Sequence, residues 1–221
     1  MTTNIINLLK LFLSNNSLLR ILQIYNCLNI KLGGLNLEFG AIENKNKTFS
    51  NFFKGKNKFE YTNIIANKKL NIFYSDLTKK LKIKKHKYNN ILIFNVLEHL
   101  PKYNLAFSET YRILKKGGYL IGSTPFLYQI HSAPQDYFRY TKDFLDLNLK
   151  KNKFKNIKIV SLGKGPFVAS YSLIHPYIKF LPFFSQIILL ITYILDSFIQ
   201  IFVRTNLSEI FPIGYLFIGK K

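Results

Sequence analysis

Apolar residues along this chain follow two periodicities in turn, and their alternation predicts a doubly wound α/β domain. Seven short apolar runs have the character of strands: LNLEF (35–39), YTNII (61–65), LNIFY (70–74), NILIFNV (90–96), YLIGST (119–124), IKIVSL (157–162) and FPIGYLFIGKK (211–221). The run at 90–96 is apolar throughout, as expected of a strand buried on both faces. Helical spacing lies between strands at 101–116, before Gly117-Gly118, and at 142–150. Strands that alternate with helices predict a mostly parallel sheet.

The organisation predicted for 1–221 is a single domain. It comprises N-terminal helices (1–32), a Rossmann-like core (33–165), an apolar helical insertion (166–206) and a final strand (207–221). Residues 4–28 have the spacing of one or two helices, and Ser17 is placed to cap the second. No signal peptide is predicted, and a single cysteine, Cys27, fits a cytoplasmic location, with membrane association as the alternative.

The insertion contains the apolar segment FFSQIILLITYILDSFIQIFV (183–203), which is long enough to cross a bilayer. On a helical projection its polar residues, among them Ser185, Asp196 and Gln200, fall in one arc. A central Asp196 is costly in lipid. Three interpretations stay open. The wide apolar face packs within the protein or in a homodimer, makes peripheral contact with a membrane, or spans one.

The composition adds a formal net charge of +21, from 32 Lys plus Arg against 11 Asp plus Glu. Such an excess is typical of proteins that bind nucleic acid. Here Lys, Asn, Ile, Phe and Tyr, which have A/T-rich codons, are abundant together, and the basic residues are mostly scattered Lys without an Arg cluster. Genome composition is therefore the preferred explanation, and no nucleic-acid partner is expected. A basic RNA-binding or RNA-methylating protein stays an alternative.

The stretch FNVLEHLPKYNLAFSETYRILKKGGYLIGSTPF (94–126) resembles the class I S-adenosylmethionine-dependent methyltransferases. It combines a buried strand that runs into NVLEHL (95–100), a helix that ends in RILKKGG (112–118), and the next strand. The resemblance covers 34–162 and looks most like a methyltransferase type 11-like branch found with bacterial surface-polysaccharide biosynthesis. It implies a seven-stranded sheet with its last strand antiparallel, S-adenosylmethionine as cofactor, and methylation of a hydroxyl on a sugar, glycan or other small acceptor.

Ligands of open α/β sheets bind at the carboxyl ends of the strands. Carried over from the family, the cofactor residues are Glu38 and Gly40 after the first strand, Asp76 after the third and Asn95 near the end of the fourth. Asp76 has an equally good interpretation as a loop residue that starts a turn.

Two segments depart from the family pattern, the loop after the first strand and the end of the second strand. Of three alternating glycines only the first is kept, because Ile42 and Asn44 stand where the others are expected, and Ile65 stands where an acid usually binds the ribose. Asn tolerates left-handed backbone geometry, whereas a β-branched residue does not. The second hypothesis is therefore a catalytically degenerate member that acts as a binding module.

The loop HSAPQDYFRYT (131–141) matches the acceptor loop of the same branch. His131 is the candidate general base, since imidazole titrates near pH ~6.5. Asp136 is expected to orient it or bind sugar hydroxyls, Arg139 to clamp an anionic group, and Tyr137 and Tyr140 to bind substrate. The alternative is a surface ion pair between Asp136 and Arg139, with the aromatic rings packed as core.

No metal is predicted. Glu98 and His99 follow the fourth strand, where some relatives carry an acidic residue and a histidine that bind a metal. One such pair without a second set of ligands does not define a site. His86 is expected in a solvated basic loop, and His175 in a structural position before a proline.

Overall fold

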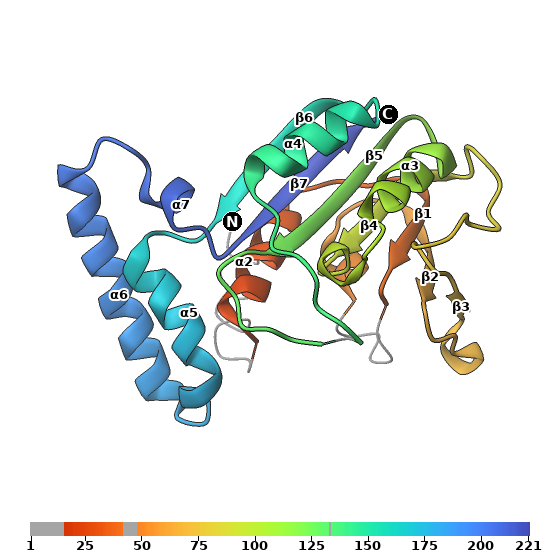
Figure 1. The fold of residues 1–221 in the computed structure, drawn as a ribbon. Coiled ribbons are helices and arrows are strands. Elements are labelled where there is room, and N and C mark those ends of the chain that lie inside the picture. The colour runs from red at the N-terminus through yellow and green to blue at the C-terminus, as the bar shows by residue number, and fades with distance from the viewer. Residues whose placement is uncertain (1–15, 42–47, 133) are drawn as a thin grey trace. The chain divides into compact units, whose positions relative to one another are not determined.

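The computed structural model describes residues 16–41, 48–132 and 134–221 (Figure 1). These residues divide into two compact units. The first contains the described part of 1–28, together with 125–129 and 161–215, and the second contains the described parts of 29–124 and 130–160, together with 216–221. The helix expected before Ser17 lies outside the described residues.

Within the described residues the strands form a seven-stranded sheet in the order β3-β2-β1-β4-β5-β7-β6. The strands are β1 (Gly34–Phe39), β2 (Asn57–Asn63), β3 (Ile72–Tyr74), β4 (Tyr88–Phe94), β5 (Leu114–Pro125), β6 (Lys155–Leu162) and β7 (Gly214–Lys220). The pairs β1–β2, β1–β4, β2–β3 and β4–β5 are parallel. The backbone N–H of Gly117 donates to Lys221, and that of Lys221 donates to Gly118, so β7 runs antiparallel to β5. The predicted Rossmann-like sheet is confirmed.

The central strand β4 is buried on both faces, as its continuous apolar run predicts. Ile91, Leu92 and Ile93 are at most 1% exposed. The outer strands differ more from their predicted ranges. β2 begins at Asn57 and ends at Asn63, before Ile64 and Ile65. β3 is shortened because Lys68–Leu70 form a 3-10 turn. Local apolar content therefore located the strands but misplaced the ends of those at the edge.

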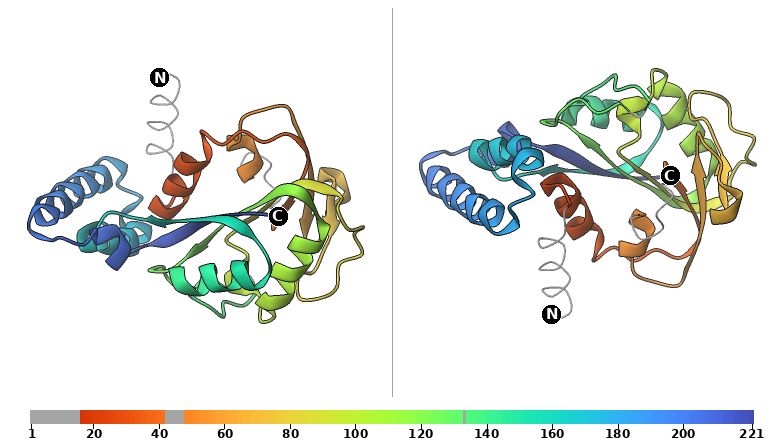
Figure 2. Two further views of the ribbon diagram at one scale, coloured as in Figure 1. Left: turned by 90° about the horizontal axis from the view of Figure 1, so that it is seen from above. Right: turned by 90° about the horizontal axis from the view of Figure 1, so that it is seen from below.

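Two helices of the second unit, α3 (Tyr103–Ile113) and α4 (Lys142–Lys151), lie on the same face of the sheet (Figure 2). Thr141 caps α4, because its Oγ1 accepts a hydrogen bond from the backbone N–H of Phe144 at 3.3 Å. The predicted end of α3 at the glycine pair is wrong. The helix ends at Ile113, and the pair lies inside β5, where a Cβ on Gly118 would lie 2.3 Å from the carbonyl oxygen of Asn89. This glycine permits close approach of two strands.

The first unit contains four described helices: α2 (Leu18–Cys27), α5 (Pro166–Ile178), α6 (Pro182–Phe202) and α7 (Leu207–Ile210). The expected cap of α2 is present, since Ser17 Oγ accepts from the backbone N–H of Arg20 at 3.3 Å. The helices α5 and α6 form a hairpin (Figure 1).

The polar arc of α6 faces α5. Ser185 Oγ lies 2.8 Å from the hydroxyl of Tyr171, and both side chains are buried. The fully buried carboxylate of Asp196 accepts hydrogen bonds from the backbone N–H groups of Phe167 and Val168, at 3.0 and 2.9 Å, at the start of α5. Asp196 therefore caps a neighbouring helix, where the positive end of the helix dipole favours a carboxylate.

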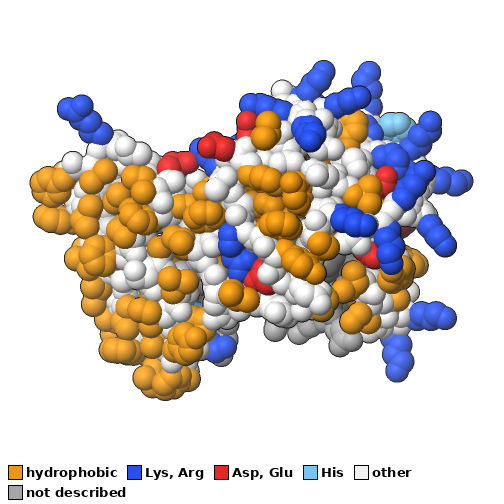
Figure 3. Space-filling view, in the orientation of Figure 1, with side chains coloured by type: hydrophobic (Ala, Val, Ile, Leu, Met, Phe, Trp, Pro, Cys, Tyr) orange, Lys and Arg blue, Asp and Glu red, His pale blue; other side chains and the backbone are white. Residues whose placement is uncertain are grey.

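The apolar face of α6 is turned outward. Figure 3 shows hydrophobic side chains gathered over α5 and α6. More than a third of each of these α6 side chains is exposed: Phe183, Phe184, Ile187, Leu190, Ile191, Tyr193, Ile194, Leu195, Phe198, Ile201 and Phe202. Only 11% of the most apolar stretch of α6 is buried, although the helix is long and apolar enough to cross a membrane. The hairpin therefore exposes an apolar surface, while the polar contacts of Ser185 and Asp196 lie between its two helices.

Candidate functional site

The carboxyl ends of β1, β2, β3 and β4 border one cavity of about 480 Å³ in the second unit. It is lined by Gly40 after β1, Asn63 at the end of β2, Asp76 after β3 and Asn95 after β4. This is where the strand order reverses around β1, and the volume lies in the range of small-molecule sites. The structure thus brings Gly40, Asp76 and Asn95 together, as the resemblance implied.

Gly40 lets the backbone turn sharply at the edge of this cavity. Its φ is +73°, and a Cβ at this position would lie 2.5 Å from Cγ2 of Val96. Both the left-handed geometry and the close contact require glycine. Residues Ile42 and Asn44, where the family pattern has two further glycines, lie outside the described residues.

Glu38 does not line the cavity. Its buried carboxylate accepts hydrogen bonds from the backbone N–H groups of Phe49 and Ser50, at 2.8 and 3.0 Å. These residues begin the short 3-10 helix η2 (Phe49–Phe52), and the ring of Phe49 stacks on Phe94 with ring centres 4.0 Å apart. Glu38 therefore holds the start of the segment at Phe49 and Ser50, and the direct contact with the cofactor implied for it stays a prediction.

At the end of β2 the cavity is lined by Asn63 and Ile64, whereas Ile65 is 73% exposed and lies outside the lining. Ile65 aligns with the ribose-binding acid of the family pattern, but β2 ends before that position. The side-chain Nδ2 of Asn63 donates to the carbonyl of Ala41 at 2.8 Å. The polar group at this edge of the cavity is therefore an amide.

Asp76 both starts a turn and lines the cavity, so its two interpretations are compatible. Its Oδ1 accepts from the backbone N–H and the hydroxyl of Thr78, at 2.9 and 2.6 Å, and its Oδ2 lies 3.2 Å from Nζ of Lys79. Burial acts to raise the pKa of Asp76, but the hydrogen bonds from Thr78 and the interaction with Lys79 together outweigh it and the pKa is lowered. Asp76 is therefore an ionised acceptor at neutral pH.

The loop 131–141 is attached to the short 3-10 helix η4 (Leu97–His99) that follows β4. The backbone N–H groups of Tyr137 and Phe138 both donate to the carbonyl of Glu98, at 2.8 and 3.2 Å. The hydroxyl of Tyr140 donates to the carbonyl of Leu97 at 3.0 Å. Tyr137 lines the cavity and is half exposed, but Tyr140 is buried and stacks on neighbouring rings. The expected substrate contact of Tyr140 is thus corrected to a structural one.

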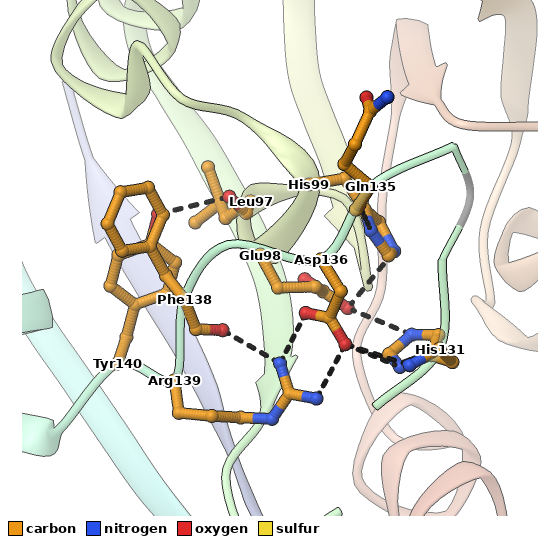
Figure 4. A network of polar contacts seen from close by, with 9 residues as sticks. All are labelled: Leu97, Glu98, His99, His131, Gln135, Asp136, Phe138, Arg139 and Tyr140. Carbon is orange, nitrogen blue, oxygen red and sulfur yellow. Dashed lines mark hydrogen bonds and ion pairs between the residues drawn. The ribbon is translucent and has the colours of Figure 1, made fainter. Parts of the chain in front are cut away.

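His131, Asp136 and Arg139 form one polar network (Figure 4). Oδ2 of Asp136 accepts from the backbone N–H of His131 at 2.9 Å and lies 3.3 Å from its ring Nδ1. Arg139 binds the same carboxylate through both terminal nitrogens, at 2.5 and 2.7 Å. These hydrogen bonds from Arg139 lower the pKa of Asp136 to about 2.

The ion pair between Asp136 and Arg139 is not a surface pair, because only 2% of the Asp136 side chain is exposed. Two nitrogens of the guanidinium bind Asp136, and one of these also donates to the carbonyl of Phe138. In this geometry Arg139 holds Asp136, and Asp136 orients His131. Clamping of an acceptor by Arg139 stays a prediction.

Glu98 and His99 lie next to this network, and His131 joins them. The side chain of Glu98 is fully buried, and burial raises its pKa to about 8. Its Oε1 lies 3.8 Å from Nε2 of His99 and 3.8 Å from Nε2 of His131. Along the sequence, Glu98 and His99 form a pair without a predicted third ligand. His131 was not predicted to join this pair, because its contact with Glu98 requires β4 and β5 to be neighbours in the sheet. The one signal in the sequence was that the Glu98 and His131 segments follow these two strands.

Comparison with known proteins agrees with this geometry. The family model of a methyltransferase domain matches residues 54–122, which run from before β2 into β5. No curated protein matches the sequence.

Solved structures share the fold. A SAM-dependent methyltransferase from Archaeoglobus fulgidus superposes with a TM-score of 0.54 at 16% identity, over 88% of each chain. One from Thermotoga maritima gives 0.54 at 16% identity, over 93% of this chain and 89% of that one. Phosphoethanolamine N-methyltransferase 2 of Haemonchus contortus, in complex with phosphomonomethylethanolamine and S-adenosylhomocysteine, gives 0.53 at 14% identity, over 92% of this chain and 52% of that one. At these identities the likeness concerns the fold, which this chain shares with these methyltransferases.

Proposed function

We propose that this protein is an S-adenosylmethionine-dependent methyltransferase. The observation that carries the proposal is the cavity at the carboxyl ends of β1 to β4, where Gly40, Asn63 and Asp76 surround one space of about 480 Å³. The methyltransferase-domain match over 54–122 includes Asn63 and Asp76, and the fold agrees with it.

The residues around the cavity fit the cofactor. The turn at Gly40 allows close backbone approach, because a side chain there is excluded by Val96. Asp76 is an ionised acceptor suited to the amino group of adenine, and the amide of Asn63 stands where the ribose hydroxyls are expected. A neutral amide binds a diol more weakly than a carboxylate does, so the cofactor affinity is expected to be modest.

The acceptor is a hydroxyl of a sugar or another small molecule, as the resemblance of the 131–141 loop implies. The acceptor oxygen attacks the methyl carbon, the carbon–sulfur bond breaks, and sulfur keeps the electron pair and becomes a neutral thioether. The hydroxyl proton moves to Nε2 of His131, whose Nδ1 faces Asp136 at 3.3 Å. Tyr137, which belongs to the same loop, lines the cavity and positions the acceptor.

Calorimetric titration with S-adenosylmethionine and S-adenosylhomocysteine tests the proposal. Saturable binding of one ligand per chain is expected, and absence of heat up to millimolar ligand would leave only the binding-module hypothesis. His131→Ala is expected to lower turnover by roughly 100-fold or more while cofactor affinity changes little. His175→Ala is the control, since it removes a histidine of the first unit. Equal loss of turnover and cofactor affinity in His131→Ala would contradict its role as base.

We also propose that the protein acts in the cytoplasm at a membrane surface, which it contacts through the α5–α6 hairpin. The polar contacts of α6 are internal, through Ser185 and Asp196, and its exposed face is apolar and rich in Phe and Ile. An interfacial position accommodates such a face without burying Asp196 in lipid. A membrane location suits a lipid-linked glycan acceptor, and a homodimer through the same face is the competing outcome.

A further inference from the structure

Glu98, His99 and His131 direct their ligand atoms toward one another (Figure 4), and His99 lines the cavity. Both Nε2 atoms lie 3.8 Å from Oε1 of Glu98, and the three atoms all lie within 4.8 Å of one another. Ligand atoms about 2.1 Å from a tetrahedral ion stand roughly 3.4 Å apart. The two distances to Oε1 exceed that value by about 0.4 Å.

The carboxylate of Glu98 gives an independent indication of a cation. Its side chain is 0% exposed, and neither Oε1 nor Oε2 has a hydrogen-bond partner among the described residues. Buried carboxylates are ordinarily paired, hydrogen-bonded or bound to metal, because an unpaired buried charge is costly. The guanidinium of Arg139 binds Asp136 through two nitrogens. A cation beside Oε1 would satisfy Glu98.

Both imidazole rings are oriented as metal ligands are. Nδ1 of His99 lies 2.5 Å from the carbonyl oxygen of Gln135, which can only accept, so Nδ1 carries the proton and Nε2 presents its lone pair toward Glu98. Nδ1 of His131 lies 3.3 Å from Oδ2 of the ionised Asp136, which orients the second ring in the same sense. A carbonyl or carboxylate behind each histidine is the usual outer shell of a protein metal site.

We propose that Glu98, His99 and His131 bind one divalent transition-metal ion, with Zn²⁺ as the reference case. Two imidazole nitrogens and one carboxylate oxygen suit zinc and its first-row neighbours, whereas Mg²⁺ and Ca²⁺ prefer oxygen ligands throughout. Three protein ligands leave at least one coordination position open. His99 itself lines the cavity, so the open position is accessible from the space assigned to the ligands.

One consequence rests on the proposed function. An acceptor hydroxyl coordinated at the open position would have a lowered pKa and would release its proton to solvent, because the lone pair of His131 Nε2 would then hold the ion and could not take the proton. Binding of the ion itself does not depend on methyl transfer.

The test is a titration of the chelator-treated full-length chain with Zn²⁺ by calorimetry, and with Co²⁺ by visible absorption. One ion per chain is expected, with Co²⁺ giving a spectrum of nitrogen–oxygen coordination. His131→Ala and the isosteric Glu98→Gln are each expected to weaken Zn²⁺ binding by at least ~100-fold, and Asp136→Asn by about 10–100-fold through the outer shell. The controls His86→Ala and His175→Ala remove the other two of the four histidines and should leave affinity unchanged.

Failure to saturate near one ion per chain would overturn the metal site, as would an affinity that His131→Ala and Glu98→Gln leave intact. Circular dichroism should show that the Glu98→Gln variant is folded, so that a loss of Zn²⁺ affinity in this variant is not due to misfolding. Protein that binds S-adenosylmethionine but not Zn²⁺ would overturn the metal site alone and leave His131 as the base. Protein that binds Zn²⁺ but neither S-adenosylmethionine nor S-adenosylhomocysteine would overturn the proposed function alone.

Discussion

A Cβ atom on Gly40 would lie 2.5 Å from Cγ2 of Val96, on the segment that follows the neighbouring strand. Real Cβ atoms essentially never make contacts this short. The space beside Gly40 is occupied by the side chain of Val96 and leaves no room for a side chain at position 40. The relationship links the ends of β1 and β4, the two central strands at the cavity.

Gly40→Ala is therefore expected to damage both stability and cofactor binding. The positive φ and the contact with Val96 together should lower the free energy of unfolding by about 1–3 kcal/mol. Urea denaturation and calorimetric titration with S-adenosylmethionine measure the two effects. Gly33→Ala is the matched control, because a Cβ at Gly33 meets nothing within 4 Å. Wild-type cofactor affinity in Gly40→Ala would contradict the close approach of ligand and backbone.

Asp76→Asn separates the two interpretations of Asp76. The amide oxygen can still accept from Thr78 and keep the turn, but the charged acceptor in the cavity is lost. Thermal stability should change little, while affinity for S-adenosylmethionine falls by about 10–100-fold. Asp146→Asn, which removes a charge paired with Lys150 on α4, serves as the control. Unchanged affinity in Asp76→Asn would leave the turn as its sole role.

The raised pKa of Glu98 predicts a pH dependence of stability in chelator-treated protein. Burial raises this pKa from 4.5 to about 8 in the folded chain, so the folded state binds the proton more tightly than the unfolded state does. This contribution is fully present below pH 4.5 and is lost as the pH rises toward 8, at a cost on the order of a few kcal/mol. Glu98→Gln should remove that slope in urea denaturation between pH 5 and 8, and an identical slope in the variant would rule out Glu98 as its source.

Asp196→Ala is expected to destabilise the α5–α6 hairpin. The substitution leaves the backbone N–H groups of Phe167 and Val168 without their acceptor and removes a carboxylate from the start of α5. A loss of about 2–4 kcal/mol in the free energy of unfolding should follow, measured by denaturation in detergent-free buffer. Ser197→Ala, one position along α6 and only partly buried, is expected to stay within about 0.5 kcal/mol of wild type. Equal effects of the two substitutions would disprove the capping role.

Membrane contact through α6 predicts sensitivity to charge on its apolar face. Phe183 and Ile201 are 78% and 77% exposed, so Phe183→Glu combined with Ile201→Glu should not perturb folding. In liposome flotation the double variant should lose most membrane binding, because burying two carboxylates in the interface is costly. Leu147→Glu, on α4 and 64% exposed, is the matched control. Retained flotation would rule out membrane contact through this face. A wild-type dimer in solution that the double variant dissociates would favour the homodimer instead.

The sequence by itself determined the class of fold. Periodicity is a local property, so the apolar run of β4, the helical spacing of α3 and the cap at Ser17 could be predicted without knowledge of tertiary contacts. Strand alternation then placed Gly40, Asp76 and Asn95 at one edge of the sheet, which the structure brings around one cavity.

Tertiary structure alone decided which side chains meet. The amphipathic pattern of α6 identified two faces, but only the α5–α6 hairpin shows that the polar face is internal, since Asp196 finds its donors on α5. Likewise, Glu98 and His99 are only neighbours along the chain. His131 joins them because backbone hydrogen bonds attach the loop after β5 to the turn after β4. Contacts between distant segments depend on strand order and on hydrogen bonds across it, and no local pattern encodes these.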